Sequence, residues 1–132
     1  MMELMLMLMK RDTTEPLGFC GSIDIDNAVM RELHGIGVDI WIGNCAKITK
    51  ILPGIIKAEK IIRDGSKEVS PEARRVVEWL MDATVFAEKW PGEGMTVGYM
   101  DEDENEHMRK LTPEEADGEF CVIGVRKQGD DQ

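Results

Sequence analysis

The segment GNCAK, residues 43–47, holds the residues whose types and order point most directly to chemistry. A strand is expected to end before this segment and a helix to begin within it, which places Cys45 at the first helical position. The helix dipole and the free backbone N–H groups lower the pKa of a thiol at that position, and a nearby lysine adds to the effect. Cys45 is therefore a candidate catalytic nucleophile, and Asn44 and Lys47 are candidate ligand-binding residues.

A second group of polar residues, Asp24, Asp26 and Asn27, follows an expected strand over residues 19–25. If that strand is parallel to the one before GNCAK, both carboxyl ends lie at the edge of the sheet where ligands usually bind. Asp26 would then be a catalytic acid–base group beside Cys45, and Asp24 and Asn27 would contact a ligand. The inert alternative makes the thiol a small buried group and Asp26 a helix cap, and it is favoured because no motif supplies a base.

Methionine and leucine alternate through residues 2–10, MELMLMLMK. Thioethers bind Cu(I), and Met5, Met7 and Met9 share one face of an extended chain. Alternate residues of a strand lie about 6.5–7 Å apart, however, which is too far for one ion to be shared. Because both rows are apolar, we predict instead that residues 3–9 form an internal strand with both faces covered. We expect no metal and no cofactor.

Two other segments contain ligand-like residues without the setting that the ligand needs. DEDENEH, residues 101–107, begins with the ligand spacing of an EF-hand loop, but Glu106 replaces the turn glycine and Thr112 the bidentate glutamate. PGEGMTVG, residues 91–98, is glycine-rich, but it runs from a helix into a strand, opposite to a dinucleotide-binding loop. We expect a solvated acidic loop and an ordinary connection.

The length and composition indicate one folded domain over residues 1–132, with residues 128–132 as a flexible tail. The 132 residues are 42% apolar and 32% charged, as in folded soluble proteins. No apolar run reaches the roughly 20 residues of a membrane helix, and the pattern of an export signal is lacking. Three widely spaced cysteines argue against disulfides and a zinc knuckle. We therefore expect a cytoplasmic protein with reduced thiols.

The net charge of −10 is distributed unevenly along the chain. Residues 46–63 contain five basic residues and one acid, whereas residues 101–132 contain eleven acids and four basic residues. The overall sign opposes non-specific binding to nucleic acid or to an anionic membrane surface. The basic segment is suited to a small anionic ligand, and the acidic segment suggests an inhibitor that mimics nucleic acid.

The elements that must position these residues follow from apolar periodicity. Because a short helix separates the second and third expected strands, we predict that these two strands are parallel. The fold class is α/β (or α+β), with a single-layer mixed sheet of about five strands and helices packed on it. The expected strands cover residues 3–10, 19–25, 37–43, 95–100 and 120–127.

The helices are predicted from their apolar stripes and from the residues that begin and end them. Asp26 and Ser70 are the expected N-caps of two of them. Pro53 should break or sharply kink the helical region around it. Thr112 and Glu115 form a capping box, which predicts a helix of little more than one turn. The expected longer helices cover residues 27–34, 45–52, 55–65 and 70–89.

The leading functional hypothesis is a non-catalytic domain that binds a partner or a small ligand. Trp79, Phe86 and Trp90 lie along one side of the longest expected helix, and aromatic residues are enriched in protein interfaces. We therefore expect a homo-oligomer formed through that helix. The alternatives are a small thiol-dependent enzyme centred on Cys45 and the acidic inhibitor described above.

Overall fold

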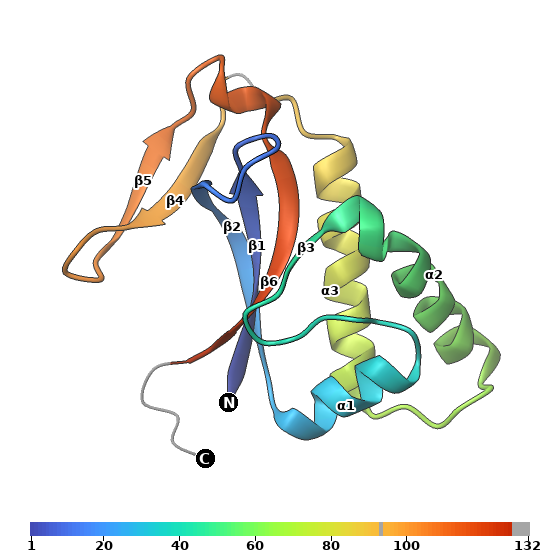
Figure 1. Cartoon of the computed structure of the whole chain (residues 1–132). Helices are drawn as coiled ribbons and strands as arrows, with labels where there is room; N and C mark the ends of the chain where they lie inside the picture. Colours follow the sequence, from blue (N-terminus) through green and yellow to red (C-terminus); the bar gives the residue numbers. More distant parts are fainter. Residues whose placement is uncertain (93, 128–132) are drawn as a thin grey trace.

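The computed structural model describes residues 1–92 and 94–127, which have an α+β fold (Figure 1). These residues form three helices and a six-stranded sheet in the order β3-β6-β1-β2-β4-β5, and neighbouring strands are antiparallel. The predicted fold class is confirmed, with six strands in place of about five. The strands are β1 (Met2–Met9), β2 (Pro16–Ile25), β3 (Cys45–Lys47), β4 (Thr96–Met100), β5 (Glu106–Lys110) and β6 (Glu119–Arg126), and the helices are α1 (Asn27–Gly35), α2 (Ile48–Asp64) and α3 (Pro71–Glu88).

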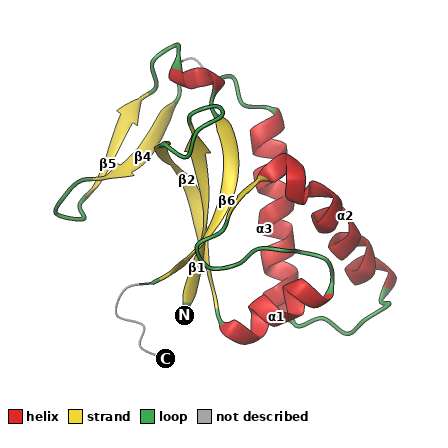
Figure 2. Ribbon diagram, in the orientation of Figure 1, coloured by secondary structure: helices red, strands yellow, loops and turns green. Residues whose placement is uncertain are grey.

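The two faces of β1 have different surroundings. The strand lies between β6 and β2, so the prediction of an internal strand is confirmed. Leu4, Leu6 and Leu8 are at most 4% exposed, because α2 and α3 lie on their side of the sheet (Figure 2). Met5 and Met7 point to the other face and are only half-buried. The prediction that both faces are covered is therefore wrong at Met5 and Met7, although Met9 at the end of the same row is buried.

Residues 37–43 form a loop and not the predicted strand. Within this loop only Ile42 forms a bridge, which joins it to Gly124 of β6. A Cβ atom at position 124 would lie 2.7 Å from the carbonyl oxygen of Trp41, so the loop approaches β6 this closely because residue 124 is glycine. The apolar residues of this segment alternate because two alternate side chains of the loop, Val38 and Ile40, pack on the core. The same alternation is typical of a strand, which explains the wrong prediction.

The third strand is β3, which pairs with β6 at the end of the sheet. Because β6 and β1 separate β3 from β2, and each pair along this path is antiparallel, β3 and β2 run in opposite directions. The predicted parallel pair, residues 19–25 with residues 37–43, is wrong because residues 37–43 form no strand and their one bridge is to β6. The nine-residue helix α1 lies at the end of the sheet where β2 finishes, and the loop after it leads to the far edge (Figure 1).

The predicted caps of α1 and α3 are confirmed. The Asp26 carboxylate accepts a hydrogen bond from the Val29 N–H group at 2.8 Å. The Ser70 hydroxyl accepts one from the Ala73 N–H group at 3.2 Å and donates one to Glu32 at 2.9 Å. Ser70 therefore starts α3 and also ties it to α1.

The helix α2 continues through Pro53, so the predicted break is wrong. Proline lies in the second turn, where it removes only one helical hydrogen bond, and Ile51 and Ile55 on either side are buried in the core. Gly54 is required for a different reason, because a Cβ atom there would collide with the carbonyl oxygen of Gly37. The glycine thus allows the loop before β3 to pack against the helix.

The region after α3 contains one strand that the sequence reading missed. β4 and β5 form a hairpin around the acidic residues 101–105, and its second strand begins with Glu106 and His107, the last two residues of the expected solvated loop. The capping box is confirmed, since Glu115 accepts from the Thr112 N–H group and Thr112 accepts from the Glu115 N–H group. It precedes a 3-10 turn, η1 (Glu115–Asp117).

In the described part of the chain, no helix has the length and apolar character needed to cross a membrane. The expected tail, residues 128–132, lies outside the described residues.

Candidate functional site

Cys45 is the first residue of β3 and its side chain is exposed. The helix that follows begins three residues later, at Ile48. The prediction that Cys45 occupies the first helical position is therefore wrong, and the expected effect of the helix dipole on its thiol does not apply. Asn44 and Lys47 do lie with Cys45, and all three line a shallow cavity of about 440 Å³.

The acidic candidates lie elsewhere. Asp24 pairs with Lys127 at 3.1 Å, Asp26 caps α1, and Asn27 is the exposed first residue of that helix. β2, which these residues end or follow, is three strand spacings from β3, or about 14 Å across the sheet. The structure therefore does not bring Asp26 to Cys45 as an acid–base partner.

A second cysteine does lie beside Cys45. Cys121 of β6 is opposite Lys47 in the register, so Cys45 is its diagonal neighbour on the same face of the sheet. Burial, together with a hydrogen bond between the two thiols, raises the pKa of Cys121 to about 12. Burial alone raises the pKa of Cys20 to about 11. Both of these thiols are therefore protonated at neutral pH.

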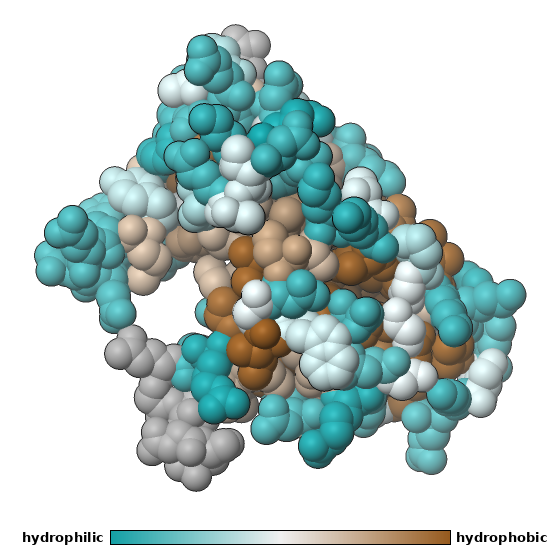
Figure 3. Space-filling view, viewed as in Figure 1, coloured by the Kyte–Doolittle hydropathy of each residue, from teal (hydrophilic) through white to brown (hydrophobic). Residues whose placement is uncertain are grey.

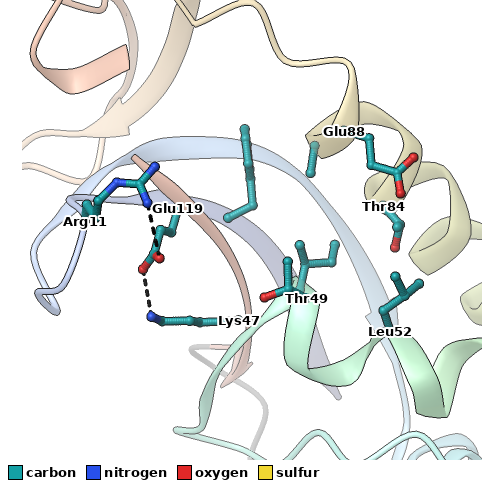
Figure 4. Close-up of a pocket in the computed structure, with 10 residues that line it drawn as sticks. Arg11, Lys47, Thr49, Leu52, Thr84, Glu88 and Glu119 are labelled. Carbon is teal, nitrogen blue, oxygen red and sulfur yellow. Dashed lines mark ion pairs between the residues drawn. The ribbon is translucent and has the colours of Figure 1, made fainter. Parts of the chain in front are cut away.

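A cavity of about 290 Å³ lies between the start of α2, the second half of α3 and the beginning of β6 (Figure 4). One wall is charged. Glu119 pairs with Lys47 at 2.9 Å and, more loosely, with Arg11 at 3.9 Å. The hydrogen bond between Lys47 and Glu119 lowers the pKa of the carboxyl group and raises that of the ammonium group. The Lys47 and Glu119 side chains are therefore both ionised at neutral pH.

The opposite wall of this cavity comes from the helices and is mainly apolar. Leu52 of α2, Ala87 of α3 and Phe120 of β6 line it. Thr84 is buried there, and its hydroxyl donates to the Leu80 carbonyl at 3.0 Å. Figure 4 shows Thr84 and Leu52 on the side of the cavity opposite Arg11, Lys47 and Glu119.

The aromatic residues predicted to form an interface partly support this apolar wall. Phe86 and Trp90 contact Phe120, with ring centroids 5.6 Å and 5.1 Å away. Trp79 is half-buried against the core. Figure 3 shows apolar surface gathered in the middle of one face of the molecule, with hydrophilic residues around it.

The sequence reading identified only Lys47 among the charged residues of this cavity. Arg11 comes from the loop after β1 and Glu119 from the first position of β6, so no short motif links them to Lys47. Thr84 offered a signal, because it is a polar residue on the predicted buried face of its helix. A buried threonine hydroxyl within a helix commonly donates to the carbonyl of the preceding turn, as Thr84 does.

The uncovered face of the sheet carries a third concave region, a groove of about 300 Å³. Met5 and Met7 of β1, Phe19 of β2 and Met100 of β4 line it. Phe19 lies across Gly98, where a Cβ atom would be 2.6 Å from its ring. The groove thus exists because the methionine row has no helix over it.

Comparison of the chain with protein-family models, curated proteins and solved structures finds no match.

Proposed function

We propose that this protein is a non-catalytic binding protein, and that the cavity between α2, α3 and β6 takes a small molecule with an apolar body and an anionic head group. The observation that carries the proposal is the division of one cavity into a charged wall and an apolar wall. Small-molecule sites typically combine mostly apolar lining with a few polar groups that fix orientation. The cavity is at the small end of the range for such sites.

The sign of the head group follows from the charges on the polar wall. Arg11 and Lys47 carry two positive charges there, and of the acids that line the cavity only Glu119 pairs with them, while Asp12 outside the lining also acts on Lys47. Glu88 lies on the opposite, helical wall (Figure 4). A ligand carboxylate near Arg11 and Lys47 would supply the second negative charge, and charge-assisted hydrogen bonds are stronger than neutral ones.

The groups in the cavity support binding more than catalysis. Neither Cys45 nor Cys121 lines it, and Thr84 already donates its proton to a main-chain carbonyl. The reduced state of Cys20, Cys45 and Cys121 in the structure is compatible with a cytoplasmic location, which is part of the proposal.

Calorimetric titration with three probes of equal chain length tests the proposal: octanoate, octanol and octylammonium. We expect octanoate to bind most tightly and octylammonium most weakly. Lys47→Met should weaken octanoate binding by about tenfold, because the head group loses a charged partner. Lys60→Met is the matched control, since Lys60 is exposed on α2 outside the cavity.

A second variant tests the apolar wall. Ala87→Leu should fill part of the cavity and reduce the affinity for octanoate and octanol alike. Equal affinity in the Lys47 and Lys60 variants, together with no effect of Ala87→Leu, would reject this cavity as the binding site.

The thiol-enzyme alternative is favoured by one observation, the contact between the buried Cys121 thiol and Cys45, which lines the neighbouring shallow cavity. It lacks the acid–base partner that Asp26 was expected to provide. The inhibitor that mimics nucleic acid stays an alternative, and a salt-dependent pull-down of basic proteins tests it. Oligomerisation through Trp79, Phe86 and Trp90 also stays a prediction. Sedimentation velocity of the Phe86→Glu variant tests it.

A further inference from the structure

The strand β5 is the last strand of the sheet, and its outer edge borders no other described strand. Its central residue, Met108, is 65% exposed, the highest value among the described large apolar side chains. We propose that β5 pairs with the β5 of a second copy of this chain, antiparallel and with a two-fold axis at Met108. The two six-stranded sheets then join into one continuous sheet.

The hairpin shows which main-chain groups are directed outwards. At its two ends, the Asp101 N–H group donates to the Asn105 carbonyl and the Leu111 N–H group donates to the Met95 carbonyl. Hydrogen-bonded pairs in an antiparallel ladder recur at every second residue, so His107 and Arg109 also direct their main-chain groups towards β4. The N–H and C=O groups of Glu106, Met108 and Lys110 therefore point away from the sheet, as an edge-pairing strand requires.

The side chains on this edge complement themselves under a two-fold rotation. With the axis at Met108, Glu106 lies opposite the partner's Lys110, and Lys110 lies opposite the partner's Glu106. Opposite charges in directly opposed positions stabilise strand pairing, and like charges destabilise it. Each such pair can also exchange two main-chain hydrogen bonds, about six in all.

The other side chains of β5 do not oppose this arrangement. His107 would lie opposite the partner's Arg109, and both are already paired with acids of their own chain. His107 contacts Asp101 at 2.6 Å, and Arg109 contacts Glu115 at 2.8 Å. The Arg109 charge is therefore compensated, and the His107 ring already has a hydrogen-bond partner, before the second copy binds.

Other two-fold registers are less favourable. An axis at His107 places each Glu106 opposite a methionine and leaves Lys110 beyond the partner's strand. An axis at Arg109 brings the two arginines face to face. Only the axis at Met108 pairs all five residues of both strands. The strand at the sheet's other edge, β3, has only three residues and therefore offers fewer main-chain groups for pairing with a second copy.

The methionine face continues across the proposed junction. Met108 lies opposite Gly98 in the hairpin register, and Met100 is opposite Glu106, so both share the face that carries the groove. Pairing around Met108 brings its side chain next to the partner's Met108. The most exposed apolar side chain of the described chain is then covered by a second copy of itself.

Sedimentation velocity from about 5 to about 500 µM, with charge-reversal variants, tests the pairing. We expect a concentration-dependent dimer whose Kd rises at least about tenfold with Glu106→Lys or with Lys110→Glu. The double variant restores opposite charges and should recover the original Kd to within about threefold. The two single variants, mixed, should form a heterodimer, because one then carries two cations and the other two anions.

Matched controls carry the same charge changes elsewhere. Glu78→Lys on α3 and Lys60→Glu on α2 are exposed positions away from β5 and should leave the Kd unchanged. Circular dichroism checks that each variant is folded.

A cross-link provides a second, independent measurement. Cα atoms of a hydrogen-bonded antiparallel pair are about 5.5 Å apart, within the range for a disulfide. In a Cys45→Ser background, which removes the exposed native thiol, Met108→Cys should therefore give a covalent dimer when oxidised by diamide, whereas Asp82→Cys on α3 should not.

Three results would overturn the proposal: a monomer throughout the concentration range, a dimer unaffected by both charge reversals, or a dimer lost with Phe86→Glu and kept by the β5 variants. The last result would assign the interface to α3.

Discussion

At the scale of single residues, the three cysteines differ in exposure, and this difference decides which of them can react. Cys45 is exposed at the start of β3, whereas Cys121 is buried beneath the same edge of the sheet and Cys20 is half-buried in β2. A thiolate is the reactive form, so burial slows a thiol both by blocking the reagent and by raising its pKa. Chemical modification therefore reports directly on this part of the fold.

We predict that iodoacetamide at pH 7 alkylates Cys45 at least about tenfold faster than Cys20 or Cys121. The pKa values of Cys20 and Cys121, about 11 and about 12, leave very little thiolate at that pH. Mass spectrometry of the digested protein identifies the modified residue. Cys45→Ser should leave only slow labelling, and urea should make all remaining thiols fast. Equal rates for the three native thiols would contradict the assigned burial.

At the scale of elements, a few side chains connect helices and strands that are distant in the sequence. Ser70 joins the start of α3 to Glu32 of α1, and Arg109 joins β5 to η1 through two hydrogen bonds with Glu115. Arg109 also donates to the Leu17 carbonyl of β2 at 3.0 Å. The three hydrogen bonds of Arg109 hold the β4–β5 hairpin against β2 and η1.

Ser70→Ala should lower the free energy of unfolding by about 1 kcal/mol, because the Ala73 N–H group loses its cap. The loss should be smaller in a Glu32→Ala background, where the second hydrogen bond of the hydroxyl is already absent. Urea denaturation measures both values. Ser66→Ala, at an exposed position after α2, is the control and should change the midpoint little. An unchanged midpoint for Ser70→Ala would contradict the cap.

Glu115→Gln should destabilise the protein by about 1–2 kcal/mol at pH 7, through loss of the charged pair with Arg109. Hydrogen bonds from Arg109 lower the pKa of Glu115 from 4.5 to about 2. A lowered folded-state pKa stabilises the protein above pH 4.5, and this contribution is lost as the pH falls from 4.5 towards 2. The difference between the variant and the original protein should shrink over that window.

Thermal unfolding at pH 7, 4 and 2.5 measures this difference, with Glu114→Gln as the control because Glu114 is exposed and adjacent. A difference that stays constant from pH 7 to pH 2.5 would show that Glu115 acts without its charge.

At the scale of the whole molecule, the sheet has one covered face and one open face. The helices bury the leucines of β1 against α2 and α3, and the methionines of the same strand border a groove on the other side. A contiguous apolar patch on the surface of a folded protein often marks an interaction site. Both the groove and the edge strand β5 therefore belong to the side of the molecule that is free to meet a partner.

Substitutions on the two faces of β1 should separate core from surface. Leu6→Ala should cost about 2–5 kcal/mol, as for other buried large-to-small changes. Met5→Ala, one residue away on the open face, should cost less than about half of that, because its side chain is already partly in water. Urea denaturation of the two variants gives the comparison, and equal losses would show that the methionine face is covered in solution.

The features that the sequence by itself determined are those with local causes. The caps at Asp26 and Ser70 and the capping box at Thr112 depend on residues at most three positions apart, so their pattern is visible in the chain. The same holds for the apolar stripe of α3 and the alternation in β1. Local hydrogen bonds and the periodicity of one element decide these features, and each was predicted correctly.

The tertiary structure decided everything that depends on which segments meet. Residues 37–43 alternate like a strand but form a loop, because a glycine in β6 lets their backbone cross it. Both rows of β1 are apolar, so only the position of the helices shows that the methionine row is partly open, at Met5 and Met7. The polar short strand β5 is stabilised by its hairpin with β4.

The cavity is the strongest case of this dependence. Its charged wall joins Arg11, Lys47 and Glu119 from three segments more than thirty residues apart, and the strand order alone brings them together. A site of this kind has no spacing that a single sequence can reveal, because the contacts that create it form only when the sheet has assembled.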